Sequence, residues 1–505
     1  MMTKYISILS ATILHLPRVS VWFLATPDIG FRLHVAHPQL HPILFLSCLC
    51  FIIDSSLLDP GFILDTSGFW SVVCGYIDLG FTFRLDPTSQ FLITSDIMTV
   101  SSAASKTVPK RLYSTESPRL EDFIKICSQR TDKATYTLAA SVEKNIPIYD
   151  ASALDPLDAH LADDLQDEWH HILNAGPGIF VLKGMYHPSR YESTLASTSA
   201  AFQRIVDQER QSTTTKGDHF AVGGKNDRIW NSFSKHATED PASFIDYYSN
   251  PWLRLVSESW LGPAYRVTAQ VNVVKPGGAA QESHRDYHLG FQELDRCAAF
   301  PRSIQLTSQY LTLQGAVAHS DMPPASGPTR FLPFSQTYEV GYLAWRRDEF
   351  RAYFKANYTA LPLALGDGLF FNPAVFHAAG ANEMEPDSSS PGGGFHRKAN
   401  LLQISSGLGK TMETIDTVPI VDRCWDGLIE RYRAAGNTLD APLEAFVLAV
   451  ADGYPFPTNL DRRPPAPSGM APESEQEIVR RGLKEGWGRE RVVGELRRMQ
   501  SDSCA

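Results

Sequence analysis

The region from Tyr265 to Ser405 constrains the fold most, because it reads as a succession of short β-strands. Runs rich in β-branched and aromatic residues follow one another there, and Gly, Pro and Asp separate them. The runs are YRVTAQVNVV, SIQLTSQYLTL, GAVAHS, TRFLPFS, LPLALGDGLFF and NLLQISS. Short strands joined by tight turns predict an antiparallel barrel or jelly roll, the double-stranded β-helix. We therefore expect a mainly β fold with flanking helices.

Helical patterns precede this region. Residues 160–176 (HLADDLQDEWHHILNAG) have apolar side chains at helical spacing and a closing Gly. The run GIFVLKGM that follows fits a strand, and helical spacing returns over Tyr191–Gln208 and Pro241–Leu261. We expect these helices to pack on the outside of the strands.

The peptide QESHRDYHLGF places His284 and Asp286 two residues apart. In an extended segment, residues i and i+2 point to one face, so an imidazole and a carboxylate can share a cation. A second His from another strand would complete a two-His-one-carboxylate triad, which leaves positions on iron open. His377 is the candidate, because LFFNPAVFH reads as a strand that ends in this residue.

Arg397 opens a further strand in the run GGGFHRKANLLQIS. Its planar guanidinium can hold a carboxylate through two charge-assisted hydrogen bonds. At this place in the strand order, it could bind the distal carboxylate of 2-oxoglutarate.

Four motifs now stand in a definite order: HRD, SGPTRFLPFSQ, GDGLFFNPAVFHAAGAN and GFHRKANLLQIS. Together they resemble the phytanoyl-CoA dioxygenase family of iron(II)- and 2-oxoglutarate-dependent oxygenases, and the resemblance covers residues 147–408. It implies that His284, Asp286 and His377 bind Fe(2+) and are catalytic. It also implies that Arg397 binds the cosubstrate 2-oxoglutarate.

The loop EMEPDSSSPGGG between His377 and Arg397 is longer than the family's usual connection. A surface insertion explains it, because the run consists largely of Ser, Pro and Gly. His396 and Lys398 are nevertheless neighbours that could take the anchoring role from Arg397.

Other polar residues near these motifs are candidates for contacts with the cosubstrate or the substrate. Gln281 and Thr312 are assigned to cofactor binding, with Gln270, Asn272 and Gln314 as further candidates. The run TKGDHFAVGGKNDRIWN resembles the family's substrate-side loop, which would bring Lys216, His219 and Trp230 to the pocket.

Two other histidines are less convincing candidates for metal ligands. His288 lies four residues after His284, as in a helical zinc pair, but the surrounding sequence has no helical pattern. His319 and Asp321 repeat the His-x-Asp spacing, but they fall in a stretch that reads as a loop. We expect neither His288 nor His319 to bind the metal. Asp367, in Gly-Asp-Gly, is expected to stabilise a tight turn.

The composition limits the partners. A net charge of -10 argues against a surface that follows nucleic acid phosphates. Seven scattered cysteines favour a reducing compartment, and we expect a cytoplasmic protein. The longest apolar stretch, Pro42–Ile53, is shorter than the roughly 20 residues of a membrane helix, so a membrane partner is not expected. The expected partners are a small-molecule substrate and O2, with the oligomeric state open.

The amino-acid composition changes along the chain and divides it into four segments. Residues 1–97 form an atypical extension that we expect to lie outside the folded domain, with a targeting segment as the alternative. Residues 98–453 are the expected oxygenase domain, 454–473 a Pro-rich linker and 474–505 an amphipathic C-terminal helix.

The expected reaction is hydroxylation or desaturation of a C–H bond in a small organic substrate, with release of succinate and CO2. Two alternatives remain: a jelly-roll metal enzyme that does not use 2-oxoglutarate, and a binding protein that has kept only the fold. The carboxylate of Asp286 argues against a halogenase, in which that position lacks a metal-binding side chain.

Overall fold

The structure is a computed structural model that describes residues 108–211, 225–387 and 393–505, and four short strands nearer the N-terminus. The chain divides into two units, Met1–Thr107 and Val108–Ala505. In the first, β1 (Val21–Ala25) pairs with β2 (Phe31–Val35), and β3 (Arg84–Leu85) pairs with β4 (Phe91–Leu92). The expected boundary between residues 97 and 98 lies outside the described residues. The boundaries at 453/454 and 473/474 also stay predictions.

The second unit is built on an eight-stranded mixed sheet with the order β5-β6-β7-β12-β10-β16-β9-β8. Only β6 and β7 run parallel to each other. A separate two-stranded sheet pairs β11 with β13. The strands are β5 Ser141–Glu143, β6 Ile146–Asp150, β7 Ile179–Lys183, β8 Asn226–Ile229, β9 Tyr265–Val274, β10 Thr312–Ala318, β11 Arg330–Leu332, β12 Gly368–Phe371, β13 Phe376–Ala378, β14 Pro386–Asp387, β15 Gly393–Gly394 and β16 Arg397–Ser406.

Helices flank this sheet, so the mainly β expectation describes its centre and not the whole unit. They are α3 Leu120–Cys127, α4 Ala159–Asn174, α5 Pro188–Gln211, α6 Ser232–Glu239, α7 Pro241–Tyr248, α8 Pro251–Leu261, α9 Leu294–Ala298, α10 Arg302–Ser308, α11 Gly341–Ala344, α12 Asp348–Asn357, α13 Thr417–Ala434, α14 Ala441–Val450, α15 Glu475–Lys484 and α16 Arg489–Ser503. Short 3-10 turns stand at Lys133–Thr135, His288–Phe291, Pro324–Ser326 and Ser335–Thr337. Among the described helices, none combines the length and apolar character that crossing a membrane requires.

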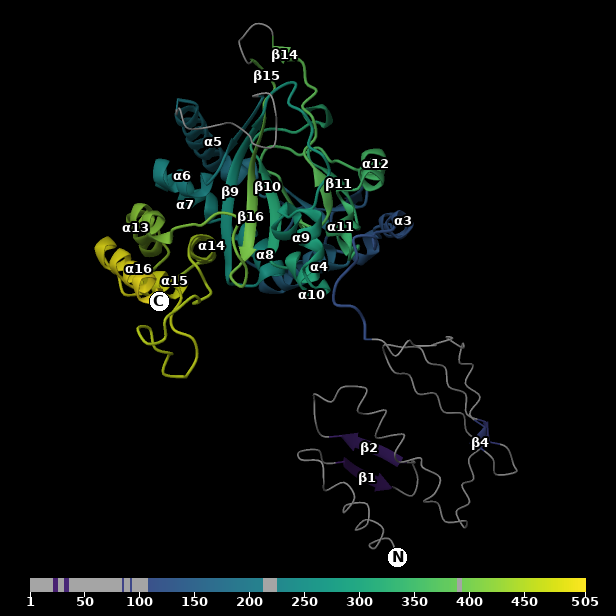
Figure 1. The fold of residues 1–505 in the computed structure, drawn as a ribbon. Coiled ribbons are helices and arrows are strands. Elements are labelled where there is room, and N and C mark those ends of the chain that lie inside the picture. Colours follow the sequence, from purple (N-terminus) through teal and green to yellow (C-terminus); the bar gives the residue numbers. More distant parts are fainter. Residues whose placement is uncertain are drawn as a thin grey trace, which may run out of the picture. The chain divides into compact units, whose positions relative to one another are not determined.

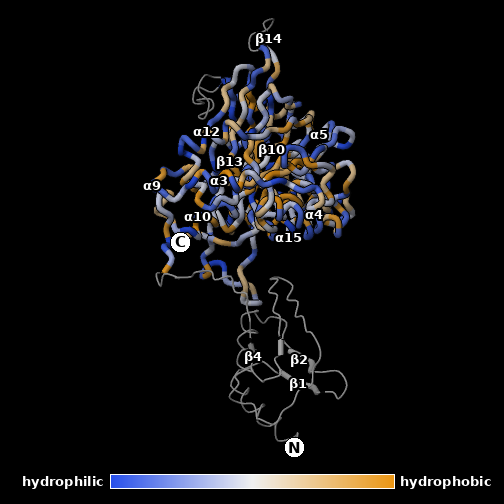
Figure 2. The backbone as a smooth tube through the Cα atoms, turned by 90° about the vertical axis from the view of Figure 1, so that its right-hand side faces the viewer, coloured by the Kyte–Doolittle hydropathy of each residue, from blue (hydrophilic) through white to orange (hydrophobic). Residues whose placement is uncertain are grey.

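The two faces of the large sheet meet different environments because side chains alternate along each strand. On β9, Val267 and Ala269 join the main apolar cluster with α4, α7, α8, α13 and α14, whereas Gln270 and Asn272 face a cavity. Figure 1 shows α6, α7, α13 and α14 on one side of β9, β16 and β10, and β11 and α12 on the other. Hydrophobic residues concentrate in the interior of this unit (Figure 2).

The C-terminal segment forms two helices, α15 and α16, where one was expected. Ser474 begins α15 with a capping box that it forms with Glu477. Ile478, Leu483 and Val492 are buried in the same apolar cluster as the outer face of the sheet. The tail is therefore part of the core of this unit.

Two strand expectations were wrong. The run SIQLTSQYLTL contains helix α10 and then a turn before β10 begins at Thr312. Its buried residues Gln305 and Ser308 are three apart, which is a helical spacing that alternating apolar residues had concealed. LFFNPAVFH is two strands, β12 and β13, because Pro373 has no N–H to donate and the Asn372 side chain accepts from Ala374 N.

His319 follows β10 and is part of the packing between helices and sheet. Its Nδ1 lies 3.0 Å from Ser199 Oγ on α5, and its Nε2 lies 3.0 Å from the Tyr247 hydroxyl on α7. Burial, with a smaller effect of Lys398, lowers its pKa from 6.5 to about 3. His319 therefore stays neutral in the folded protein and links two helices to the strand, as expected for a histidine that is not a metal ligand.

Lowering the pH below about 6.5 should destabilise the protein through this residue. Between pH 6.5 and about 3 the unfolded chain binds a proton at His319 that the folded chain does not. The free energy of unfolding therefore decreases as the pH is lowered through this range. The slope is about 1.4 kcal/mol per pH unit for one such histidine. Urea unfolding of the wild type and His319→Asn at pH 5 to 7 checks this. The wild type should lose stability more steeply, and parallel profiles would contradict the assignment.

Candidate metal centre and its cavity

A cavity of about 650 Å³ opens on the inner face of the large sheet. β8, β9, β10, β12 and β16 contribute side chains from the sheet, and the segment 279–286 and β13 close the opposite side. His284, Asp286, His377 and Arg397 all line it. The four residues that the sequence singled out thus come together in one cavity, although more than a hundred positions separate the first from the last.

The two histidines are brought together by the backbone. His284 N donates to His377 O over 3.0 Å, and His377 N donates to His284 O over 3.1 Å. This antiparallel bridge extends the β11–β13 sheet by one residue pair. Two residues further, Asp286 returns to the same face and its N donates to Pro373 O. The i, i+2 spacing therefore works here as the extended geometry requires.

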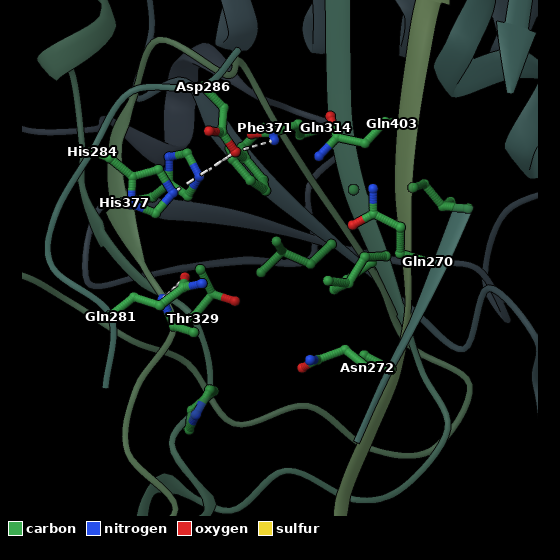
Figure 3. Close-up of a pocket in the computed structure, with 18 of the residues that line it drawn as sticks. Gln270, Asn272, Gln281, His284, Asp286, Gln314, Thr329, Phe371, His377 and Gln403 are labelled. Carbon is green, nitrogen blue, oxygen red and sulfur yellow. Dashed lines mark hydrogen bonds and ion pairs between the residues drawn. The ribbon is translucent and has the colours of Figure 1, made fainter. Parts of the chain in front are cut away.

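Ligand atoms of the three side chains all lie within 4.8 Å of one another. The Nε2 atoms of His284 and His377 lie 3.8 Å and 3.5 Å from Asp286 Oδ2. Figure 3 shows both imidazoles turned toward the carboxylate at one end of the cavity. Two imidazole nitrogens and one carboxylate oxygen are the donor set of non-haem iron(II) sites, so the chemistry of the residues fits iron.

Both imidazoles are fixed in the tautomer that a metal needs. His284 Nδ1 donates to Glu282 O and His377 Nδ1 donates to Val375 O, each over 2.8 Å. A carbonyl can only accept, so Nδ1 carries the proton and the Nε2 lone pair faces the cavity. Burial lowers the pKa of His284, which keeps its ring neutral.

Asp286 is oriented from the sheet side. Gln314 on β10 donates its amide Nε2 to Asp286 Oδ2 over 2.7 Å, as Figure 3 shows. Burial alone would raise the pKa of Asp286, but the two imidazoles and this amide outweigh it and hold the pKa below its ordinary value. The carboxylate is therefore charged and ready to bind a cation.

Arg397 is a buried guanidinium that no carboxylate neutralises anywhere in the described ranges. Its hydrogen bonds, from Nη1 to Ser326 O and Gly380 O, are long at 3.4 and 3.3 Å. Burial, together with the like charge of Arg228, lowers its pKa to about 10. A buried cation with unused donors fits an anionic ligand group. Of its sequence rivals, Lys398 lines a different, small pocket, and His396 does not line this cavity.

Of the other polar residues that the sequence suggested, some line the cavity and some do not. Gln270, Asn272, Gln281 and Trp230 line the cavity, and Gln281 holds β13 by accepting from Ala379 N. Thr312 does not line it and lies 3.4 Å from His288 Nε2. Lys216 and His219 lie outside the described residues. Asp367 accepts from Ala364 N and Gly184 N, which confirms its role at the turn.

The sequence did not single out several residues that shape the site. Arg285, between the two ligands, donates to the carbonyl oxygens of Ser335 and Tyr338 and is buried against Tyr342 and Phe376. It supports the ligand segment from behind. Arg228 on β8 and Gln403 on β16 line the cavity. The available signal for Gln403 was one amide in an otherwise apolar strand run, LLQIS.

Residues 177–385 match the family model of phytanoyl-CoA dioxygenase (PhyH), a range that includes the three candidate ligands and ends before Arg397. No curated protein matches the chain.

Three solved structures with some similarity share 14–17% identity with the chain. The epimerase SnoN, solved with Fe3+, alpha ketoglutarate and nogalamycin RO, is 15% identical, with 48% of this chain and 85% of that chain covered and a TM-score of 0.34. The alpha ketoglutarate-dependent carbocyclase SnoK is 17% identical, with 49% and 86% covered and a TM-score of 0.34. AviO1 from Streptomyces viridochromogenes Tue57 is 14% identical, with 48% and 95% covered and a TM-score of 0.32. Similarity at this level does not transfer a reaction.

The family match and the His-Asp-His group agree with what the sequence motifs implied. Residues 177–385 form a domain of the phytanoyl-CoA dioxygenase family, and the chain is an enzyme of this iron- and 2-oxoglutarate-dependent kind.

Proposed function

We propose that the chain oxidises a C–H bond of a small organic substrate, by hydroxylation or desaturation, while 2-oxoglutarate and O2 are converted to succinate and CO2. His284, Asp286 and His377 hold the iron(II), and Arg397 holds the distal carboxylate of 2-oxoglutarate. The observation that carries this proposal is the buried Arg397, which has no carboxylate partner in the described chain and lines the same cavity as the triad. When bound, the iron would supply activation of O2 coupled to oxidative decarboxylation of the 2-oxo acid.

The chain's own residues prepare the site for this chemistry. Backbone carbonyls fix the imidazole tautomers, and Gln314 fixes the carboxylate. Phe371, whose ring lies 4.7 Å from that of His377, and Leu369 make an apolar wall that keeps water from the reacting groups.

We also propose that the core is a jelly roll. β9, β10, β12 and β16 would form its larger sheet, and β11, β13 and the bridge at His284 would form the smaller one. The cavity between these two sets of strands supports this arrangement, because small-molecule sites lie at the mouths and interiors of such double sheets.

The two alternative functions, a metal enzyme without 2-oxoglutarate and a binding protein, predict different residues in the cavity. A jelly-roll metal enzyme that does not use 2-oxoglutarate has no need for an unpaired guanidinium in the cavity. A binding protein that kept only the fold would tolerate loss of a metal ligand, and all three are present.

Removing a metal ligand should abolish turnover. His377→Ala and Asp286→Ala each delete a donor of the triad, so neither variant should form succinate, and both should bind Fe(II) weakly in an anaerobic titration. His288→Gln changes a nearby histidine that does not line the cavity and should keep both properties. Succinate formation by either ligand variant would contradict the metal assignment.

Removing the guanidinium of Arg397 should weaken the binding of 2-oxoglutarate. Arg397→Met should raise the KM for 2-oxoglutarate about 30-fold or more, since losing a buried charge pair costs about 2–5 kcal/mol. Fe(II) binding should be unaffected. Lys398→Met, on the next residue and the opposite face of β16, is the matched control and should leave KM unchanged. An unchanged KM in Arg397→Met would remove 2-oxoglutarate from this position.

Gln314 should affect metal binding through Asp286. Gln314→Leu deletes the hydrogen bond that orients the carboxylate and should weaken Fe(II) affinity by about 10- to 100-fold. Gln314→Glu places a second carboxylate against Asp286 and should shift the pH dependence of Fe(II) binding, whereas a purely structural role would not. Equal Fe(II) affinity in wild type and Gln314→Leu would contradict the positioning role.

A further inference from the structure

The cavity wall next to the metal centre carries a patch of three amide side chains: Gln270 on β9, Gln314 on β10 and Gln403 on β16. Gln314 and Gln403 are direct cross-strand partners, and Gln403 pairs with Thr268, two residues from Gln270. Cross-strand partners share a face, so the three amides adjoin one another. Figure 3 shows Gln270 and Asn272 on the wall across the cavity from the two imidazoles.

Two of these amides keep an oxygen that the protein does not satisfy. Gln403 is 8% exposed, and its Oε1 is buried without a hydrogen-bond partner within the described ranges. Gln314 Oε1 is in the same state, although its Nε2 holds Asp286. Gln270 donates to Met412 Sδ, which is a weak acceptor, and its amide also interacts with the Glu413 carboxylate. Buried amides are normally hydrogen-bonded, so a patch of this kind in a cavity points to a ligand.

The patch lies at the metal end of the cavity, because Gln314 donates to Asp286 and pairs with Gln403. Arg397 and Gln403 are six residues apart on one continuous strand, which corresponds to about 20 Å between their Cα atoms. A 2-oxo acid held at Arg397 therefore keeps its distal carboxylate away from the amides, and Gln403 is available to the other organic reactant.

The neighbouring wall has the opposite character. Leu369 and Phe371 on β12, with Leu361 and Leu363 beside them, line the cavity and belong to one apolar cluster. The volume of about 650 Å³ is in the range of small-molecule sites, and the metal and the cosubstrate share it with the substrate. A ligand that satisfies both walls has a polar edge and an apolar body.

We propose that the substrate is a compact ring molecule with hydroxyl groups near the reacting carbon, which donate to Gln403 and Gln270, while its apolar face lies against β12. This inference rests on the proposed function and names its substrate class. A simple acyl chain has no donors near the reacting carbon and would leave the amides unsatisfied.

The test compares two probes with the same skeleton: naringenin, a hydroxylated flavanone, and unsubstituted flavanone. Each is titrated calorimetrically into the full chain loaded anaerobically with Fe(II) and 2-oxoglutarate, and palmitoyl-CoA serves as the acyl thioester arm. Naringenin should bind about tenfold more tightly than flavanone, the effect of one good hydrogen bond. Gln403→Met should abolish this preference.

Folding is controlled separately. Gln403→Met removes a buried, unpartnered amide, so the variant without ligand should melt at the same or a higher temperature than the wild type. Gln305→Met is the matched control, because Gln305 is a buried glutamine outside the cavity whose Nε2 donates to Cys297 O and Phe300 O. It should melt lower and keep the preference for naringenin.

Three results would overturn the inference: equal affinity for both flavanones, tighter binding of palmitoyl-CoA, or a preference that survives in Gln403→Met. The proposed function has its own readout, which is succinate formed from 2-oxoglutarate by the wild type without added substrate. Succinate with equal flavanone affinities would reject the substrate class alone. No succinate, with Fe(II) and 2-oxoglutarate present, would reject the function.

Discussion

The site depends on one backbone bridge, the pair of hydrogen bonds between His284 and His377. It joins a segment without regular strand pairing to β13, and every further feature of the centre follows from that register. Asp286 reaches the same face because it stands two residues on. A slip of one residue would place Arg285 where His284 stands and turn the imidazole away. Each histidine also takes its tautomer from the carbonyl two residues before it in its own segment.

Side chains alternate between the two faces of the large sheet, so one face packs against the helices and the other lines the cavity. Along β9 and β16, every second side chain packs against the helices, and the residues between them form the cavity wall. The apolar side fixes the strands by burial, so the polar side is free to carry groups that stabilise nothing by themselves. Gln403 and Arg397 stand on that side of β16 and line the cavity. Their presence there is better explained by ligands than by packing.

Much of the centre could be predicted from the sequence, because its ligands obey local rules. The spacing of His284 and Asp286, the downstream His377 and the strand-opening Arg397 could all be recognised in the sequence, and the structure brings them together in one cavity. Thr312 lies on β10 with Gln314, but at the start of the strand, where it is next to His288 and outside the lining of the cavity, so its assignment to the cosubstrate stays a prediction. The cavity-facing positions of Arg228 and Gln403 were not assigned, since only the pairing of β8, β9, β10 and β16 shows which face these residues occupy. The burial of α15 and α16 is likewise a tertiary outcome of a charged sequence.

Arg397 has a consequence for the empty enzyme. A guanidinium that is buried without a counter-ion raises the free energy of the folded state, and this cost is relieved when an anion enters. Under the proposed assignment of Arg397, the cosubstrate also stabilises the folded state, by an amount that depends on its concentration. In such a protein, the concentration of a central metabolic acid and the free energy of unfolding of the enzyme would be linked through a single side chain.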